Sequence, residues 1–304
     1  MTKATVLITT KNRCDDLRNA IKSALCQSAR PEVLVVDDGS TDNSANMVRQ
    51  EFPDVKLHVS ENSKGYISQR NFGARIATGD IVFSMDDDAV FSSPLIVEQT
   101  LKDFDNPIVG AVAIPYIDIN KSPKINDLSP SKEIIYAAYS FIGTSHAIRK
   151  DIFQSLGGYR EFLIHQCEEE DLCIRMLNSG HIVRCGRSDP IHHFESPRRS
   201  FSRMDFYGAR NKVLYAWNNV PFPYFPFHLV LTSFLTSIQN YQPNRAFTRW
   251  RGVWDAYSLC FSKKADRRPV SSSVYRLSRK LKKKGPLPIN DSALTNLLKL
   301  NGLY

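Results

Sequence analysis

Three consecutive aspartates, Asp86 to Asp88, stand in the stretch SMDDDAVF, directly after an apolar run that begins at Ile81. Adjacent carboxylates repel one another, so a fold that keeps three of them together needs a compensating cation. Oxygen ligands favour a hard ion such as Mg²⁺ or Mn²⁺, which typically keeps water and takes phosphate oxygens as further ligands. Side chains two apart on a strand point the same way, so we expect Asp86 and Asp88 to face one ligand and Asp87 to turn aside. The stretch therefore predicts a divalent metal that holds a phosphorylated substrate.

Five apolar segments, separated by amphipathic ones, position these aspartates within the first 117 residues. The predicted strands cover residues 5–10, 33–37, 55–59, 81–85 and 108–114. Helices are predicted in the gaps: one carries an apolar stripe from Leu17 to Leu25, one follows the capping residues DGSTDNS, one spans 67–77 and one follows Pro94. Repeated βα units predict an α/β fold, in which a doubly wound, mostly parallel sheet is flanked by helices and binds ligands at its carboxyl edge.

Polar side chains also follow the first two predicted strands. Thr9, Thr10 and Asn12 stand at the end of the first strand, and Asp37 and Asp38 follow the second. Because several strands deliver polar groups to one edge, we expect a binding site there and not merely a capped loop. The loop TTKNRCDD after the first strand has neither the GxGxxG pattern of dinucleotide enzymes nor a Walker A pattern, so neither phosphate cradle is predicted.

Five ordered segments resemble family 2 glycosyltransferases of GT-A fold, over roughly residues 4–215. They are VLITTKNR, LVVDDGSTDNS, ENSKGYISQRNFGARIATGD, SMDDDAV and EEEDLCIRMLNSGH. The resemblance implies transfer of a sugar, with inversion at the anomeric carbon, from a nucleotide-diphosphate sugar. It also implies a divalent metal, Mg²⁺ or Mn²⁺, that offsets the charge of the departing diphosphate.

The resemblance assigns roles in donor binding to individual residues. Thr9 and Asp38 would sit at the nucleobase, with Asp38 accepting a hydrogen bond from a ring N–H. Arg70 would lie near the nucleotide and its diphosphate. Asp86 would approach the ribose, and Asp88 would ligate the metal.

Further candidates complete the expected donor and metal site. Asn12 and Asp87 are expected on the donor side. His193, in PIHHFESPRR, is a candidate metal ligand because a histidine in this place binds metal in some GT-A enzymes; its neighbour His192 would face the opposite way. Four more polar residues, which could contact donor phosphates or an anionic acceptor, are Arg198, Arg199, Arg210 and Asn211.

An acceptor hydroxyl is a poor nucleophile at neutral pH and needs a general base. The segment CEEEDLCIRML aligns with the family motif ED-x-DL-x-x-R, which carries the base in related enzymes. The alignment selects Glu169, with Glu168 as the alternative and Asp171 as a structural partner. The plainer interpretation is that these acids are only the first turn of a helix, where the helix dipole favours negative charge.

The chain is expected to divide into two parts. Residues 1–220 would form the catalytic domain, with a nucleotide-sugar half at 1–117 and an acceptor half at 118–220. Residues 221–304 would form a helical, basic extension. The net charge of +9 gathers there, in SKKADRRPV and YRLSRKLKKKG.

The extension begins with PFPYFPFHLVLTSFLTSI, which is too short and too rich in proline to cross a bilayer. With the basic segments that follow, it is compatible with binding an anionic membrane surface. A buried helix with a solvated basic tail explains the same residues, and both interpretations are kept.

The composition of the chain and the motifs that it lacks indicate its cellular compartment and its binding partners. Six scattered cysteines without a CxxC pattern suit a reducing compartment, and the N-terminus lacks the apolar run of a signal peptide. We therefore expect a cytoplasmic protein, with peripheral attachment to the inner face of the cell membrane as a further expectation. No nucleic-acid-binding motif is found, so nucleic acid is not expected as a partner. A glycan or a lipid-linked acceptor is expected beside the nucleotide-sugar donor.

Two alternative functions share part of this pattern. A nucleotidyltransferase also uses strand-end aspartates and a metal, but usually carries a glycine-rich basic loop that TTKNRCDD does not match. A non-catalytic membrane or assembly protein could retain a transferase-like domain, although the acidic residues of the expected site are all present.

Overall fold

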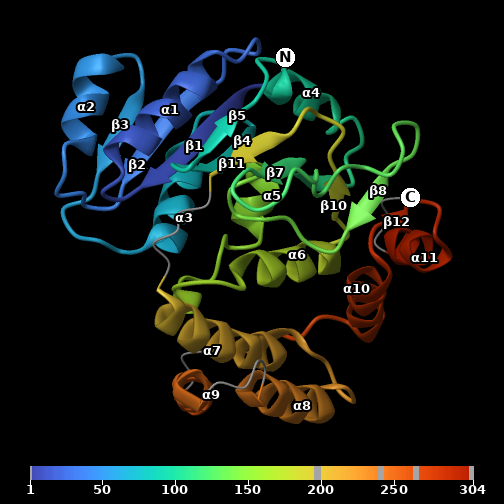
Figure 1. Ribbon diagram of the computed structural model, residues 1–304. Coiled ribbons are helices and arrows are strands. Elements are labelled where there is room, and N and C mark those ends of the chain that lie inside the picture. Colours follow the sequence, from blue (N-terminus) through green and yellow to red (C-terminus); the bar gives the residue numbers. More distant parts are fainter. Residues whose placement is uncertain (1, 195–199, 239–242, 263–266, 301–304) are drawn as a thin grey trace.

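The computed structural model describes residues 2–194, 200–238, 243–262 and 267–300 (Figure 1). Within these residues nine strands form one sheet, in the order β12-β8-β10-β6-β9-β4-β1-β2-β3. Its strands are β1 (Ala4–Thr10), β2 (Glu32–Asp37), β3 (Lys56–Val59), β4 (Ile81–Asp86), β6 (Val109–Ala113), β8 (Tyr136–Ala138), β9 (His146–Arg149), β10 (Ile182–Cys185) and β12 (Leu287–Pro288). All of them except β8 and β9 run in the same direction.

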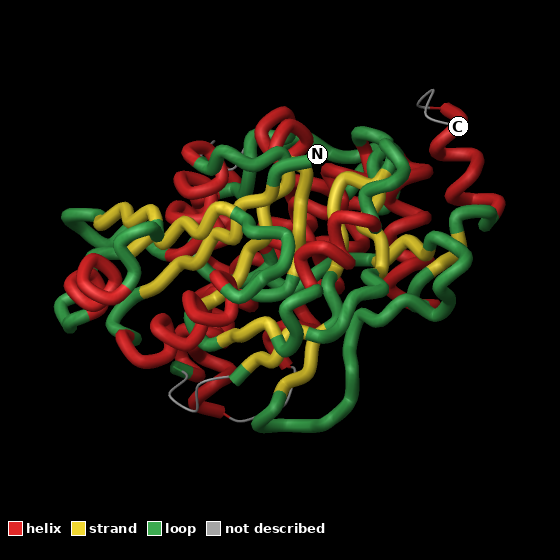
Figure 2. Tube along the Cα trace, turned by 90° about the horizontal axis from the view of Figure 1, so that it is seen from above, coloured by secondary structure: helices red, strands yellow, loops and turns green. Residues whose placement is uncertain are grey.

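The predicted βα alternation of the first half is confirmed. Helices α1 (Cys14–Leu25), α2 (Ser44–Glu51), α3 (Tyr66–Ile76) and α4 (Ile96–Lys102) occupy the gaps between the predicted strands. Side chains alternate along β1, so Val6 and Ile8 share a core cluster with α1 while Leu7 faces α3. Gly73 lets α3 approach closely, because a Cβ there would lie 2.3 Å from Cδ1 of Leu7. Helices consequently lie on both sides of the sheet (Figure 2).

The order of the strands differs from a simple parallel series. β9 lies between β4 and β6 and runs antiparallel to both. β9 is only four residues long, and its sequence HAIR carries no period that would reveal its partners. Its neighbours are set by packing across the chain and not by its own pattern.

A second, smaller sheet lies beside the carboxyl end of β4. In the described part of the chain it contains three strands, β5 (Ala89–Phe91), β11 (Ile191–His193) and β7 (Tyr116–Asp118), with β11 in the middle. β5 begins immediately after Asp88, and β11 ends at His193. Pairing of β5 with β11 therefore brings His193 next to the three aspartates Asp86 to Asp88, which we call the acidic turn.

Helices of the second half form two groups. The first comprises α5 (Lys150–Ser155), the 3-10 turn η1 (Glu161–Leu163), α6 (Glu168–Asn178) and α7 (Phe201–Asn219). The second comprises α8 (Phe225–Ile238), α9 (Pro243–Phe261), α10 (Ser272–Lys284) and α11 (Ser292–Leu300). α8 and α9 pack on α7, α10 packs on α6, and β12 pairs with β8 at the edge of the large sheet. The segment after residue 220 thus packs on the sheet and its helices, and the proposed domain boundary there stays a prediction.

Among the described helices, none is both long and apolar enough to span a membrane. α8 is the most apolar of them, but it has 14 residues.

Candidate active site

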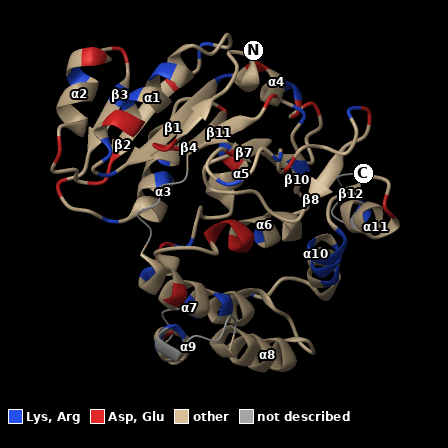
Figure 3. Cartoon of the chain, viewed as in Figure 1, with Lys and Arg blue, Asp and Glu red and all other residues tan. Residues whose placement is uncertain are grey.

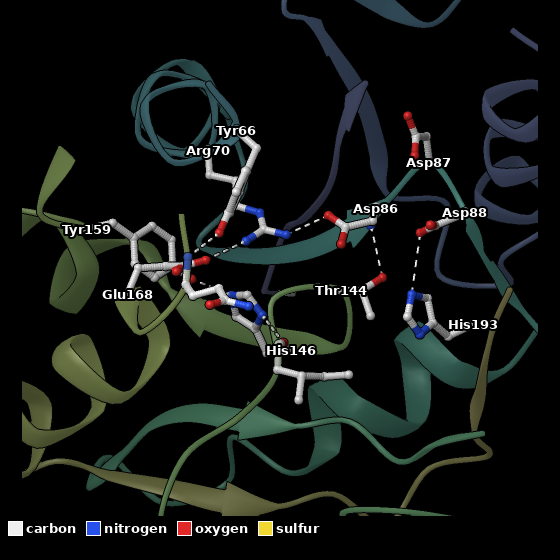
Figure 4. A network of polar contacts seen from close by, with 12 residues as sticks. Tyr66, Arg70, Asp86, Asp87, Asp88, Thr144, His146, Tyr159, Glu168 and His193 are labelled. Atoms are coloured by element: carbon white, nitrogen blue, oxygen red, sulfur yellow. Dashed lines mark hydrogen bonds and ion pairs between the residues drawn. The ribbon is translucent and has the colours of Figure 1, made fainter. Parts of the chain in front are cut away.

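Each aspartate from Asp86 to Asp88 is paired with a cationic side chain of the protein. Figure 4 shows the contacts of Asp86 with Arg70 and of Asp88 with His193. Asp86, the last residue of β4, accepts a hydrogen bond from Nη2 of Arg70 at 2.5 Å. Arg13 Nη1 lies 3.0 Å from Oδ1 of Asp87 and 2.6 Å from Oδ2 of Asp88. His193 Nε2 lies 3.5 Å from Oδ1 of Asp88. Protein side chains therefore supply much of the compensating charge that the sequence led us to expect from a metal.

The side chains of Asp86 and Asp88 point in directions that differ from those predicted from the sequence. Asp87 and Asp88 lie in a turn between β4 and β5, and the alternation of an extended strand does not continue through it. Asp86 faces Arg70, whereas Asp88 faces Arg13 and His193. The expectation that Asp86 and Asp88 converge on one ligand was therefore wrong as stated, because they face different partners. Asp87 does not turn away from Asp88 either, because both carboxylates contact Nη1 of Arg13.

The two carboxylates of the turn differ in their protonation. Burial raises the pKa of Asp88, but hydrogen bonds from His193 and Arg13 outweigh it and lower the pKa to about 2. Burial raises the pKa of Asp87 to about 7, against the charge of Arg13 and the hydrogen bond from Thr10. Asp88 is consequently the ionised member of the pair, as a metal ligand must be.

His193 is oriented by a second carboxylate. Its Nδ1 lies 2.6 Å from Oδ1 of Asp118 on the adjacent strand β7, and its Nε2 faces Asp88. A carboxylate on the far nitrogen is the usual support of a metal-binding histidine, because it fixes the ring and its tautomer. Pairing of β11 turns His193 toward the acidic turn, and the structure gives His192 no comparable partner there.

A divalent ion fits this arrangement only with help from a substrate. The described residues contain no group of three or more His, Cys, Asp or Glu side chains suited to hold a metal. Asp88 and His193 are two ligands of acceptable type, and Mg²⁺ and Mn²⁺ commonly complete their shells with phosphate oxygens and water. The residues therefore suit an ion that binds together with a diphosphate.

Asp38 is buried at the end of β2 and holds the loop before α3. Its Oδ1 accepts hydrogen bonds from the Lys64 N–H at 2.7 Å and from Nε2 of Gln69 at 2.6 Å, and its Oδ2 accepts one from the Ser63 hydroxyl at 2.6 Å. Burial raises the pKa of Asp38, but these hydrogen bonds outweigh it and lower the pKa. The carboxylate is thus ionised and fixes the loop that precedes α3, and its contact with a nucleobase stays a prediction.

Thr9 and Asn12 lie at the end of β1. Thr9 is buried and stands opposite Asp86 in the register between β1 and β4. Asn12 has a φ of 55°, in the left-handed region that asparagine tolerates better than most residues. Its Oδ1 accepts hydrogen bonds from the backbone N–H groups of Thr41 at 2.7 Å and Asp42 at 3.3 Å. Asn12 therefore ties together the loops that follow β1 and β2.

Arg70 connects the donor side of the site with the acceptor side. This buried arginine of α3 contacts Asp86 through Nη2 and Oε1 of Glu168, at 3.4 Å, through Nη1. Its guanidinium also lies over the Tyr66 ring, 4.7 Å from the centroid. A Cβ at Gly143 would lie 2.5 Å from Nη1 of Arg70, so any larger residue there would displace the guanidinium from its present position. The charges of Asp86 and Glu168 outweigh the effect of burial and raise the pKa of Arg70, which stays cationic.

The acidic run begins helix α6, as expected. Glu168 is buried against Arg70, whereas Glu169 keeps partial access to solvent. Burial and the neighbouring Glu168 carboxylate raise the pKa of Glu169 well above its ordinary value. Burial also raises the pKa of Glu168, although Arg70 opposes the shift. Of the two, Glu169 has access to solvent and the more strongly raised pKa, and its role as the general base stays a prediction.

Other predicted residues serve the framework around α6 and α7. Asp171 accepts hydrogen bonds from Arg160 at 2.7 Å and from Nε of Arg175 at 2.9 Å, so it is the structural partner that we expected. Arg210 Nε donates to Asp255 at 2.6 Å. Asn211 Nδ2 donates to the carbonyls of Leu163, His165 and Gln166. Arg198 and Arg199 lie outside the described residues.

Comparison with known proteins identifies the family. The model of the family described as glycosyl transferase family 2 matches residues 5–157, which include strands β2 to β9, nearly all of β1, and the acidic turn. The chain belongs to glycosyltransferase family 2. It is a glycosyltransferase of GT-A fold.

A curated relative of this glycosyltransferase is the glucosyl-dolichyl phosphate glucuronosyltransferase of Haloferax volcanii. It is 26% identical over 218 residues, which cover 63% of this chain and 69% of the relative. The next two curated relatives match over much shorter stretches, and the chain covers 27% and 29% of their lengths.

Two solved structures share the fold at low identity. The mannosyltransferase PcManGT from Pyrobaculum calidifontis, in complex with GDP-Man and Mn²⁺, has a TM-score of 0.56 and 18% identity, over 99% of this chain and 84% of the other. TarS 1-349 of S. aureus, in complex with UDP-GlcNAc, has a TM-score of 0.62 and 15% identity, over 99% of this chain and 93% of the other.

Several residues of the glycosyltransferase site were not assigned a role from sequence. Arg13 shares its charge between Asp87 and Asp88, Asp118 orients His193, and the Thr144 hydroxyl accepts a hydrogen bond from the Asp86 N–H at 3.1 Å. Arg13 had a usable signal, since it follows the first strand and neighbouring parallel strands end at one edge. Asp118 and Thr144 lie in segments without a period, and only the fold brings them to the site.

Proposed function

We propose that this glycosyltransferase moves a sugar, with inversion, from a nucleotide-diphosphate sugar to a hydroxyl of a glycan or lipid-linked acceptor, in cell-surface glycan or glycolipid synthesis. The observation that carries the proposal is the position of Arg70 between Asp86 and Glu168. Asp86 ends a strand of the donor half, and Glu168 begins the helix that carries the expected base. One buried cation thus sets the distance between the two halves of the site.

The donor assignment rests on the strand ends and on the solved relatives. Thr9, Asn12 and Asp38 surround the expected nucleobase, while Asp86, Asp87 and Arg70 lie toward the ribose and diphosphate. PcManGT and TarS have the same fold and were solved with GDP-Man and UDP-GlcNAc respectively. The Haloferax volcanii relative is named for a lipid-phosphate acceptor, which supports an acceptor of that class here.

In the transfer step the donor binds on the Asp86 side of Arg70, and the acceptor binds on the Glu168 side. Glu169 takes the proton of the acceptor hydroxyl while the oxygen bonds to the anomeric carbon. The bond between that carbon and the diphosphate oxygen breaks on the opposite face, and the nucleoside diphosphate leaves with the electron pair. Attack and departure on opposite faces invert the anomeric carbon. The raised pKa of Glu169 makes its carboxylate a stronger proton acceptor.

Asp88 and His193 would hold Mg²⁺ or Mn²⁺ together with the diphosphate, and Asp118 would keep His193 in the required orientation. A bound divalent ion would stabilise the negative charge of the leaving diphosphate as a Lewis acid. Arg13 holds Asp87 and Asp88 in position from the other side.

The test is donor hydrolysis without an acceptor. The protein is incubated with Mn²⁺ and UDP-, GDP- or dTDP-sugars, beside the Asp88→Asn variant. Release of nucleoside diphosphate by the wild type alone would support the proposal. Release of pyrophosphate would indicate a nucleotidyltransferase, and release of neither product would favour a non-catalytic role. A thermal-shift screen of the same nucleotides would identify the donor class, because the tightest ligand gives the largest stabilisation.

A further inference from the structure

Helix α8 has its apolar side in solvent and its polar side against the protein. Phe227 is 81% exposed and Val230 67% exposed, whereas Ser237 is 2% exposed. Polar contacts lie on the inner side: Nδ1 of His228 is 2.7 Å from the hydroxyl of Tyr275 on α10. This arrangement is the reverse of a helix whose outer surface is made for water.

Helix α9 continues the same apolar surface. Phe247, Trp250 and Trp254 recur at three and four residues, so they form one stripe, and Trp254 is 69% exposed. The opposite side of α9 is pressed on α7: a Cβ at Gly252 would lie 2.3 Å from the backbone oxygen of Phe206.

α8 and α9 both pack on α7 from the same side (Figure 1), and the apolar side chains that stay exposed lie on the sides of these two helices that the protein leaves uncovered. We call this surface the outer face. It comprises Phe227, Val230, Phe234, Phe247, Trp250 and Trp254.

The outer face is unlike an ordinary water-facing surface. Large apolar patches on soluble proteins usually mark an interaction with a protein or a membrane. The 32 residues between Lys212 and Arg245 contain no Asp, Glu, Lys or Arg, so α8 itself offers no charged side chain for a specific polar partner. Tryptophan side chains are favoured at the boundary between water and lipid, where the ring is buried and the N–H stays hydrated.

Positive charge adjoins the outer face. Residues 245–284 contain 13 Lys and Arg against two Asp. Helix α10 is largely blue in Figure 3, which marks its Lys and Arg residues. Three of them, Arg276, Arg279 and Lys283, are exposed, and Nη1 of Arg276 lies 3.2 Å from the hydroxyl of Tyr224, just before α8. Basic side chains beside an apolar surface select anionic lipid over neutral lipid.

We propose that the outer face binds the surface of an anionic lipid bilayer, with α8 and α9 lying in the interface and the basic side of α10 against the lipid headgroups. α8 has 14 residues and is therefore about 21 Å long, shorter than the apolar core of about 30 Å that a spanning helix must cross. An interfacial helix buries only its apolar stripe in the lipid, and that is the part of α8 that the protein leaves exposed.

Docking places the expected acceptor site near the lipid, a consequence that rests on the proposed function. α7 lies between α8–α9 and the start of α6: a Cβ at Gly208 of α7 would lie 2.8 Å from Oε1 of Gln166, which shortly precedes Glu168. Two helical layers, α7 and the α8–α9 pair, thus separate the acceptor base from the outer face, and each layer is about 10 Å thick. An acceptor anchored in the same membrane would therefore need to extend about 20 Å to reach Glu169.

The proposal is tested by flotation of the full chain with lipid vesicles. Vesicles of phosphatidylcholine with phosphatidylglycerol are compared with vesicles of phosphatidylcholine alone. The triple variant Phe227→Ser, Phe234→Ser and Trp254→Ser removes apolar groups that the fold leaves exposed. A matched control, Leu25→Ser with Leu95→Ser, removes exposed apolar side chains elsewhere on the molecule.

We expect the wild type and the control to float with anionic vesicles, and the triple variant to bind them at least about tenfold more weakly. Replacing Arg276, Arg279 and Lys283 by Gln should remove the preference for anionic lipid. Equal vesicle binding by the triple variant and the wild type would overturn the proposal. A dimer in sedimentation velocity that the triple variant abolishes, without vesicle binding by the wild type, would show that a second copy of the chain covers the face, and would also overturn it.

Donor hydrolysis separates this proposal from the transfer reaction. The triple variant should release nucleoside diphosphate at the wild-type rate, because its changes lie outside the donor site. Lost vesicle binding with intact hydrolysis in the triple variant supports docking as a separate property. Absent vesicle binding by a wild type that hydrolyses the donor overturns docking alone.

Discussion

Arg13 donates a hydrogen bond from Nη1 to Oδ2 of Asp88 at 2.6 Å. The arginine immediately precedes α1, and the aspartate lies in the turn after β4, so the pair joins two loops at the carboxyl edge of the sheet. The same nitrogen contacts Asp87. Arg13 is thus positioned to hold the acidic turn together.

Replacing Arg13 by Gln should lower the free energy of unfolding by about 1–2 kcal/mol, because two buried carboxylates lose a partner that is itself one third exposed. Mn²⁺ should raise the melting temperature of the variant more than that of the wild type, since the ion would take over part of the compensation. Arg18→Gln, which removes surface pairs with Asp15 and Glu51, is the control and should cost less stability than Arg13→Gln. An equal effect of Mn²⁺ on both proteins would argue against a metal at this turn.

Removal of the metal, or of its expected carboxylate ligand, should stop the reaction. Asp88→Asn should lower nucleoside diphosphate release by about 100-fold or more, because it removes one charged ligand of the metal. It should also lower the melting temperature, because Asp88 is paired with Arg13 and His193. Asp118→Asn should act less severely and raise the Mn²⁺ requirement by about 10- to 100-fold, because Asp118 only orients His193. Full activity of the wild type in EDTA would exclude a required metal.

Glu169→Gln and Glu168→Gln should differ in what they damage. Glu169→Gln should reduce transfer by about 10² to 10⁴ while nucleotide binding and melting temperature stay close to wild type. Glu168→Gln should lower the melting temperature as well, because it removes a carboxylate paired with the buried Arg70. Rates and melting curves are measured on the same samples. High turnover of Glu169→Gln with loss in Glu168→Gln would transfer the role to Glu168, and activity in both would place the base elsewhere.

His146 should make stability depend on pH. Its Nδ1 donates to the carbonyl of Ile142 and its Nε2 accepts from the Tyr159 hydroxyl at 3.0 Å, so the ring is buried in its neutral form. Burial, assisted by the charge of Arg70, lowers its pKa from 6.5 to about 3. The folded protein therefore binds its proton less well than the unfolded chain.

The stability associated with neutral His146 is fully present above pH 6.5 and is lost as the pH falls from 6.5 toward 3. The expected slope is at most about 1.4 kcal/mol per pH unit. His146→Gln should be less stable than the wild type at pH 7, and the difference between the two should shrink at pH 5. Urea unfolding at both values measures it, and a constant difference would contradict the buried neutral ring.

The first half of the fold could be predicted because its information is local. The apolar runs of β1, β2 and β4 and the stripe of α1 are visible in short windows, since a buried strand or helix face repeats within a few residues. Parallel strands end at one edge, so the order of the polar residues along the chain also located the acidic turn and the loops that surround it.

The partners of those residues were decided by tertiary structure. Arg70 and Glu168 are 98 positions apart, and His193 meets Asp118 across 75 positions. Placement of β9 between β4 and β6 sets the loop with Gly143 and Thr144 against Arg70 and Asp86. No local period encodes such contacts, because they depend on which segments pair after the sheet has formed.

Helix α8 shows the same division most directly. The sequence shows that this helix is apolar and uncharged and that basic segments follow it. These properties are compatible both with a buried helix and with a helix that binds a membrane surface. The orientation of the helix is decided by packing. Its polar side lies against α7, α9 and α10, where the hydroxyls of Ser233 and Tyr257 form a hydrogen bond at 2.9 Å, and Phe227 stays exposed. Composition sets how apolar a helix is, whereas the direction of each side chain depends on which neighbours the rest of the chain supplies.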